Sequence, residues 1–167
     1  MAPTDIDALS AVAQEILDAV VIVLDTTAAG APSSQFMTAA RPAIDCEFVA
    51  VQMMRLAEDT TSPLTLTETK LRKHFGNIIL ASYTVWVVRC APVIDGLRPP
   101  SDAQKTANAI TVQTDAWALW NGIRAVQDDL FDACLGVYID GGTPVPESGG
   151  FVGWQFAFRA SIEGYEN

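Results

Sequence analysis

The chain has 167 residues, of which 50% are hydrophobic and only 18% are charged, so it is too apolar to be disordered and fits one domain over residues 1–167. Ten Lys and Arg residues against twenty Asp and Glu residues give a formal net charge of −10, which argues against a protein that grips DNA by neutralising its phosphates. An acidic surface fits ordinary solvation or, alternatively, the wall of a conduit that repels passing DNA.

The residue types offer little for metal, cofactor or membrane chemistry. Three widely spaced cysteines and a single histidine, His74, predict no zinc site. Paired glycines at 141–142 and 149–150 match no phosphate-binding loop, so we expect no cofactor. The N-terminal segment lacks the basic region of a signal peptide, and the apolar run at 19–24 is too short to span a bilayer. We therefore expect a protein made in a cytoplasm, with no membrane partner.

The N-terminal part of the chain predicts a helix, a connection and a strand. Thr4 as N-cap and apolar residues at helical spacing predict a helix over residues 5–26. Ala, Gly, Pro, Ser and Thr dominate residues 26–43, which predicts an irregular connection. Residues 44–56 alternate and carry apolar side chains on both faces, which predicts a strand that is covered on both sides.

The long polar segment 58–77 is the expected contact loop. Loops of this length in compact domains tend to be functional. Four basic side chains of this acidic protein gather here, and we expect them to contact a partner: Lys70, Arg72, Lys73 and His74. A short helix over residues 67–74 is an equally plain interpretation of the same segment. No nucleophile lies beside His74 in the sequence to support a catalytic role.

The middle of the chain predicts the central strand and the longest helix. Residues 78–90 are rich in β-branched and aromatic side chains, which is typical of a central strand. Ser101 and Gln104 match a capping box, and an apolar stripe then continues to Leu130, so we expect a helix of more than twenty residues. Gly122 interrupts this stripe and favours a bend or a close contact between the helix and the sheet.

Four side chains near the second half of this helix are candidates for contacts. Trp117 and Trp120 are expected in the core or at a subunit interface, rather than as a platform for nucleic-acid bases. Asp128 and Asp132 share one helical face. An exposed, solvated face is the simpler interpretation of these acids, but acidic charge at a helix C-terminus opposes the helix dipole and indicates a partner nearby.

Two strands complete the predicted fold. Residues 137–140 form a short strand, residues 151–163 alternate cleanly, and the Gly- and Pro-rich link at 141–150 is typical of a hairpin connection. The predicted order is helix, strand, strand, helix, strand, strand. We therefore expect an α+β fold in which a mixed or antiparallel sheet is packed by an N-terminal helix and a long central helix.

Three segments together resemble a known protein family. They are VWVVRCAP at 85–92, DAWALWNG at 115–122 and GGFVGWQFAFRASIEG at 149–164. In order and spacing they are similar to the tail terminator proteins of long-tailed, siphovirus-type actinobacterial phages, and the resemblance covers roughly residues 44–163. The matching positions look structural or interfacial: Trp86, Arg89, Cys90, Asp115, Trp117, Trp120, Gly150, Gly153 and Trp154.

This resemblance implies a structural virion protein without enzymatic activity. It would close as a homo-hexameric ring on the last ring of the tail tube protein, stop tube growth, and offer a surface to the head-completion or stopper protein. DNA would pass through the lumen without specific binding, and residues 58–77 would dock on a neighbouring ring. The protein would be assembled in the host cytoplasm and would reside in the tail or neck of the virion.

Two alternatives remain open from the sequence. One is a head-closure or connector protein of the same virion neck. The other is a small-molecule enzyme that uses Cys90 or Cys134 as a nucleophile. The absence of a nearby base in the sequence disfavours the enzyme, and cysteines at strand ends, such as Cys46 and Cys90, are expected to be small buried hydrophobes.

Overall fold

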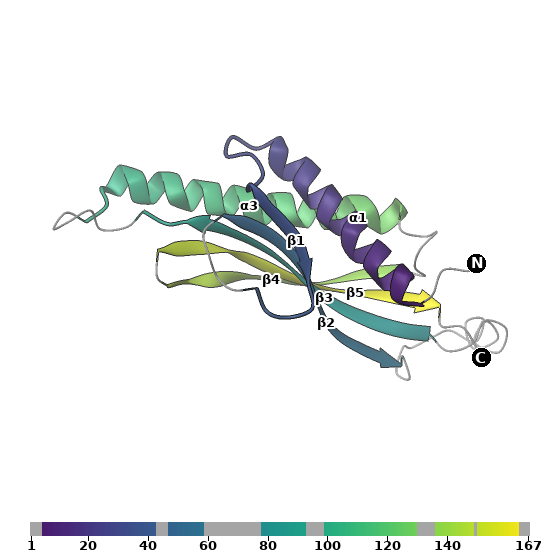
Figure 1. Ribbon diagram of the computed structural model, residues 1–167. Helices are drawn as coiled ribbons and strands as arrows, with labels where there is room; N and C mark the ends of the chain where they lie inside the picture. Colours follow the sequence, from purple (N-terminus) through teal and green to yellow (C-terminus); the bar gives the residue numbers. More distant parts are fainter. Residues whose placement is uncertain are drawn as a thin grey trace.

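Two helices cover one face of a five-stranded sheet in the computed structural model, which describes residues 5–42, 47–58, 78–92, 99–129, 136–148 and 150–163 (Figure 1). The elements in chain order are α1 (Asp5–Asp25), β1 (Ser34–Thr38), β2 (Phe48–Glu58), β3 (Ile78–Cys90), α3 (Asp102–Asp129), β4 (Gly136–Ser148) and β5 (Phe151–Glu163). The strands lie in the order β1-β2-β3-β5-β4. The β1–β2 pair is parallel and the other three pairs are antiparallel. The predicted α+β fold, with both helices packed on a mixed sheet, is confirmed.

The strand β3 is the centre of the sheet, as its sequence predicts. It pairs with β5 along its whole length, from Ile78 opposite Glu163 to Cys90 opposite Phe151, and the predicted bounds of both strands are confirmed. Successive side chains of a strand point to opposite faces. Val85 and Val87 therefore pack under the helices, whereas Trp86 belongs to a separate cluster on the other face.

The main core lies between the helices and the sheet. Tyr83 of β3 stacks on Phe158 of β5 with ring centroids 5.0 Å apart, and its hydroxyl donates a hydrogen bond to the carbonyl of Leu9 in α1 at 3.1 Å. Fully buried aliphatic side chains surround this pair: Val12, Ile16, Val20, Leu24, Val49, Val85, Val87, Leu119 and Ile123. Burial of this apolar surface is the main stabilising contribution to the fold.

The helix α1 is helical to Asp25 although its last turns are rich in β-branched residues. Val20 and Leu24 are fully buried in the core, so tertiary packing overrides the weak local propensity of this segment. Thr27 donates its hydroxyl to the carbonyl of Leu24, and Gly30 follows with a φ of 67°. The predicted helix over 5–26 is confirmed to within one residue.

The helix α3 begins with the predicted capping box. The amide of Ser101 donates to the side-chain oxygen of Gln104 at 2.8 Å, and the amide of Gln104 donates to the hydroxyl of Ser101 at 3.2 Å. Gly122 permits a close approach, as expected, but the partner is the other helix and not the sheet. A Cβ at Gly122 would lie 2.8 Å from the Cα of Val20 in α1, because the two helices cross on the same face of the sheet.

Two predicted connections contain strand residues. The expected connection at 26–43 includes β1, which pairs with β2 from Ser34 opposite Phe48 to Thr38 opposite Gln52. The expected link at 141–150 is mostly β4, which continues through its Gly and Pro residues to Ser148. The pairing of β4 with β5 shifts register at 139/141 and again at 145/148. Such β-bulges are where an edge strand accommodates Gly and Pro residues.

One further expectation holds for only part of its strand, and another is wrong. Both faces of β2 are buried in its first half, where Val49 and Val51 pack under the helices and Phe48, Ala50 and Gln52 are buried on the other face, whereas Met54 and Leu56 are exposed. Cys90, at the end of β3, is exposed and not a buried hydrophobe. The segment 59–77, together with Cys46 and Cys134, lies outside the described residues.

Candidate assembly surface

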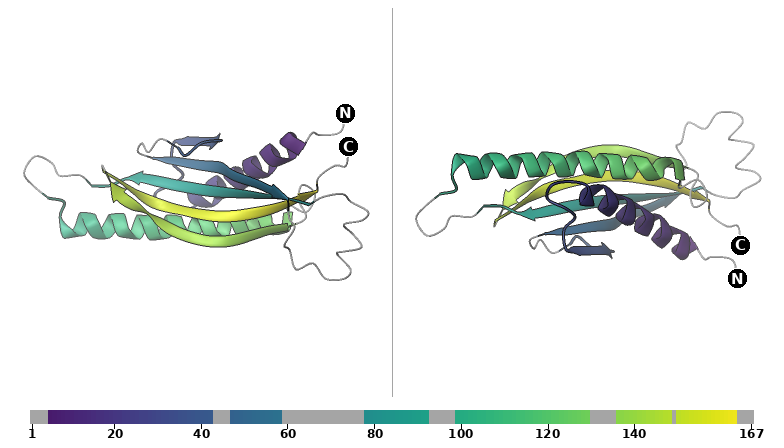
Figure 2. Two further views of the ribbon diagram at one scale, coloured as in Figure 1. Left: turned by 90° about the horizontal axis from the view of Figure 1, so that it is seen from below. Right: turned by 90° about the horizontal axis from the view of Figure 1, so that it is seen from above.

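The face of the sheet opposite the helices, here called the open face, is the most distinctive surface of the described chain. Figure 2, left, shows the strands in front of both helices, and the right view shows the helices in front. The open face carries the alternate side chains of β2, β3, β5 and β4 that do not enter the main core: Phe48, Ala50, Gln52, Thr84, Trp86, Val88, Gln155, Ala157, Arg159, Tyr138, Asp140, Thr143 and Val145.

One part of the open face forms a small apolar cluster. Trp86 and Val88 of β3 are buried against neighbours from β2 and β4, and Phe36 of β1 packs at the edge with its ring centroid 5.6 Å from that of Phe48. This cluster explains why the strands carry apolar side chains on both faces. Part of the open face is therefore already shielded from water within the single chain.

Beside this cluster the open face is hollowed into a pocket of about 600 Å³, here called the open-face pocket. Its lining residues are Arg41, Gln52, Met54, Thr84, Trp86, Asp140, Gly141, Gly142, Thr143, Gln155 and Ala157. The volume is in the range of pockets that enclose a ligand.

Two buried polar atoms in this pocket have no hydrogen-bond partner within the described part of the chain. They are the side-chain oxygen Oε1 of Gln52 and the indole Nε1 of Trp86, and each of these residues is only 6% exposed. A buried polar group without a partner costs about 1–3 kcal/mol, and such groups are rare in folded proteins. Both atoms have less than 1 Å² of accessible surface, so they lie beneath the pocket surface and an occupant of the pocket does not reach them.

Three charged side chains lie in or beside the pocket. The guanidinium of Arg41 lies over the ring of Trp86, 5.6 Å from its centroid. Arg159 and Asp140, at the β5–β4 side, form an ion pair with a shortest distance of 2.6 Å. The pocket lining itself therefore carries one cation, Arg41, and one anion, Asp140.

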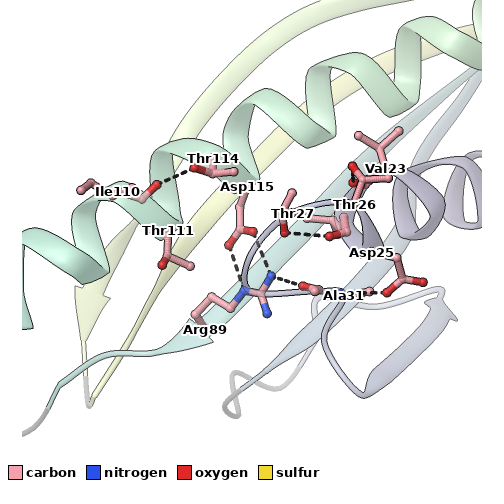
Figure 3. Close-up of polar contacts among 12 residues, drawn as sticks. Val23, Asp25, Thr26, Thr27, Ala31, Arg89, Ile110, Thr111, Thr114 and Asp115 are labelled. Carbon is pink, nitrogen blue, oxygen red and sulfur yellow. Dashed lines mark hydrogen bonds and ion pairs between the residues drawn. The ribbon is translucent and has the colours of Figure 1, made fainter.

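A buried ion pair holds the helices on the opposite side of the sheet. Figure 3 shows Arg89 of β3 reaching Asp115 of α3, with two hydrogen bonds of 2.9 Å from the guanidinium to the two carboxylate oxygens. The same guanidinium donates to the carbonyl of Gly30 at 2.7 Å. These contacts connect β3, α3 and the turn after α1, so Arg89 and Asp115, both within the family-like segments, have a structural role.

The two tryptophans expected in the core or at an interface differ in their burial. Trp120 packs against the core, with its ring 6.3 Å from that of Phe156. Trp117 is 67% exposed, and Ile110, two helical turns earlier on the same side of α3, is 58% exposed. Large exposed apolar side chains that share one helix face indicate a contact with another molecule.

The other predicted contact residues are not tested by the described structure. Lys70, Arg72, Lys73, His74 and Asp132 lie outside the described residues. Asp128 lies in the last turn of α3, and its side chain is outside the described part as well.

Gln52 and Arg41 were not predicted as site residues from the sequence. The sequence does mark Gln52 as unusual, because it is a polar residue between apolar neighbours in a predicted strand. It lies opposite Thr84, another polar residue within an apolar strand.

Metal and membrane sites have no support in the described residues. No group of three or more His, Cys, Asp or Glu side chains is placed there to bind a metal ion. Among the described helices, none is both long enough and apolar enough to cross a membrane. No protein-family model matches the sequence, and no curated protein matches it.

Proposed function

We propose that this protein is a structural subunit of a phage virion that closes as a homo-hexameric ring on the end of the tail tube. In this role it ends polymerisation of the tail tube protein and joins the tail to the head-completion protein, without catalysing a reaction. The observation that carries the proposal is the open face, where a pocket with unpartnered buried polar atoms adjoins an apolar cluster. Such a surface suits a protein that works by binding other subunits.

The placement of both helices on one side of the sheet supports this assignment. A ring subunit needs at least two different contact surfaces, because head-to-tail contacts close a ring only when unlike surfaces meet. The open face and the outer side of α3, with Trp117 and Ile110, are two such surfaces on different layers of the molecule. The segments around Trp86, Trp117 and Trp154 resemble those of tail terminators, and this resemblance is the reason for proposing a ring on the tail tube rather than another kind of assembly.

The charge of the chain supports the proposed relation to DNA. A formal charge of −10 repels a passing polyanion, so a ring of such subunits would let DNA slide through without holding it. The location in the tail or neck of the virion is part of the same proposal.

The experiment that tests the function is a stop codon in the gene, followed by electron microscopy of the lysate. We expect tails of uneven and excessive length with no heads attached, and recovery of normal particles when the intact gene is supplied in trans. Tails of uniform, normal length that lie unattached beside filled heads would instead assign the protein to the neck as a connector. Normal infectious particles would contradict both assignments.

The composition of purified virions provides a second, independent test. Quantitative mass spectrometry should find the chain in wild-type particles at about six copies, one ring per tail, as expected for a closed assembly. Absence of the chain from purified particles would contradict a structural role.

A further inference from the structure

We propose that copies of this chain join through the edges of their sheets, with the first half of β4 of one copy added as an antiparallel strand to the second half of β2 of the next. The inference rests on the self-association in the proposed function and adds the segments that meet, residues 136–140 of one copy and residues 53–58 of the other. Because the two segments differ, the contact is head-to-tail and can be repeated around a ring.

The second half of β2 has a free backbone edge within the described part of the chain. β1 pairs with β2 only from Phe48 to Gln52, whereas β3 pairs with the other side of β2 as far as Glu58. Beyond Gln52, no described strand lies on the β1 side of β2, and Figure 1 shows β2 continuing past the end of β1. Unpaired backbone groups along a strand are a template for a further strand.

The first half of β4 is the other free edge that can take a strand. β4 is the last strand of the sheet and pairs with β5 alone among the described strands. Its prolines, Pro144 and Pro146, lie in the second half, where they offer no N–H to a neighbour. Residues 136–143 contain no proline, so within β4 a regular ladder of hydrogen bonds can form only along this half.

The two free halves lie at the same end of the sheet and run in opposite directions. The pairing registers lead from Arg55 in β2 through β3 and β5 to Tyr138 in β4, so these two residues share one row across the sheet. The three pairings that connect β2 to β4 are all antiparallel, and β4 is therefore antiparallel to β2. A neighbouring copy in the same orientation thus presents residues 136–140 antiparallel to residues 53–58 and at the same level.

Both edges carry large apolar side chains that are exposed in the single chain. Met54 and Leu56 of β2 are 58% and 48% exposed, and Tyr138 of β4 is 54% exposed. An apolar pocket of about 430 Å³ lies along the same part of β2, between this strand and α1, with Leu9, Met53 and Leu56 in its lining. Apolar surface gathered along a free strand edge is typical of a surface that is covered in an assembly.

The charges at the two edges are complementary. Arg55 is exposed and forms no ion pair with another described residue. With Arg55 level with Tyr138 of the next copy, Asp140 of that copy is its diagonal neighbour, which a long side chain can reach. Asp140 accepts hydrogen bonds from Arg159 of its own copy, and a carboxylate has further acceptor sites for a second guanidinium. This contact favours one register of the added strand.

The first test blocks each edge with a lysine, a residue that opposes strand addition. We expect Leu56→Lys and Tyr138→Lys each to weaken self-association of the full-length protein more than about tenfold in sedimentation velocity. Because both side chains are exposed, the free energy of unfolding in urea should change by less than about 1 kcal/mol. Ile22→Lys replaces an apolar side chain of α1 that is 66% exposed and is the control, which should leave association within about twofold.

A mixture of the two edge variants tests the head-to-tail arrangement. Leu56→Lys keeps an intact β4 edge and Tyr138→Lys keeps an intact β2 edge, so the mixture can form one contact and no second one. We expect an equal mixture to form dimers at a concentration where each variant alone is monomeric and the wild type forms larger assemblies. A mixture that stays monomeric, or variants that associate as tightly as the wild type, would overturn the inference.

A crosslink identifies the segments that meet without blocking either edge. A photoreactive benzophenone amino acid replaces Arg55 in the full-length chain, and both concentrated protein and purified particles are irradiated. We expect a product of twice the chain mass on a denaturing gel, with the crosslink within residues 136–140. The same amino acid at Lys105, near the start of α3 and away from the end of β2 (Figure 1), is the control and should not give this product.

The outcomes separate this inference from the proposed function. Rings in which Arg55 crosslinks to another segment, to its own chain alone or to a different protein overturn the inference and leave the ring in place. Edge-to-edge crosslinks in a protein whose loss leaves tails normal keep the inference and overturn the proposed function. A chain that is monomeric at every concentration, and monomeric when released from particles, overturns both.

Discussion

Removal of the Asp115 carboxylate tests how the helices are held on the sheet. Asp115 is fully buried and accepts two hydrogen bonds of 2.9 Å from Arg89, whose guanidinium also donates to the carbonyl of Gly30. The substitution Asp115→Ala would leave the guanidinium in a dry site with one neutral acceptor. The guanidinium would then be a buried charge without a counter-ion.

The size of the effect follows from the burial of the two side chains, which are 7% and 0% exposed for Arg89 and Asp115. Breaking a buried ion pair by removing one partner costs about 3–5 kcal/mol. For a chain of this length, each kcal/mol lowers the melting temperature by about 2–4 °C, so we expect a fall of about 6–20 °C.

The chain contains its own control for this substitution. Arg159 and Asp140 form an ion pair with a similar short distance, 2.6 Å, but their side chains are 45% and 38% exposed. Exposed pairs contribute about 0–1 kcal/mol, so Asp140→Ala should cost less than about 1 kcal/mol. The two variants remove the same chemical group from the same kind of pair and differ mainly in the access of water.

The assay is urea unfolding followed by tryptophan fluorescence, with free energies from linear extrapolation at a common m value. The double variant Arg89→Met/Asp115→Ala should regain at least half of the loss, since removing both partners also removes the unpaired charge. If Asp115→Ala costs no more than Asp140→Ala, the buried pair does not hold α3 on the sheet.

Three further substitutions test other contacts of the fold and surface. Gly153→Ala would place a Cβ 2.0 Å from the carbonyl oxygen of Val87, so β3 and β5 must separate and unfolding free energy should fall by about 3 kcal/mol or more; a loss below about 0.5 kcal/mol in urea would contradict this. Ser101→Ala removes the hydroxyl that accepts from the amide of Gln104 and should cost about 1 kcal/mol in the same assay, whereas an unchanged midpoint would mean that the cap adds nothing. Trp117→Ser should change stability by less than about 0.5 kcal/mol because the side chain is 67% exposed. If Trp117 contacts a neighbouring subunit, as proposed, the variant should also be incorporated less into virions; full incorporation would show that Trp117 does not contact one.

The parts of the fold with strong local patterns were predictable from the sequence. The strands β3 and β5 have the predicted bounds, because long alternating runs define strands without help from distant contacts. The capping box of Ser101 and Gln104 is likewise a local signal that the structure confirms. These elements also place Trp86 on the open face.

The missed elements depend on pairing across the chain. The strand β1 has only five residues and exists because it lies parallel to β2, so its own composition does not reveal it. In β4, Gly142 was interpreted as a turn residue, but a Cβ there would collide with the ring of Phe156. Gly142 therefore leaves room for that ring to pack over the strand. The buried pair of Arg89 and Asp115 is 26 residues apart, which no local pattern can predict.

The candidate surface was predictable only in part. Trp117 was predicted to lie in the core or at an interface, and its exposure on α3 excludes the core. The open-face pocket was not predicted, because it arises where β2, β3, β5 and β4 bring single polar residues together. A sequence shows Gln52 and Thr84 as isolated exceptions, and only the register of the strands makes them neighbours.

The two prolines in β4 give the sheet unequal edges. An edge strand displays unpaired backbone groups on which another strand can add, but Pro144 and Pro146 have no N–H to donate, so a ladder along β4 would be interrupted twice. The opposite edge, β1, has no proline among its five residues. A ladder of backbone hydrogen bonds with a further strand is therefore harder to form along β4 than along β1.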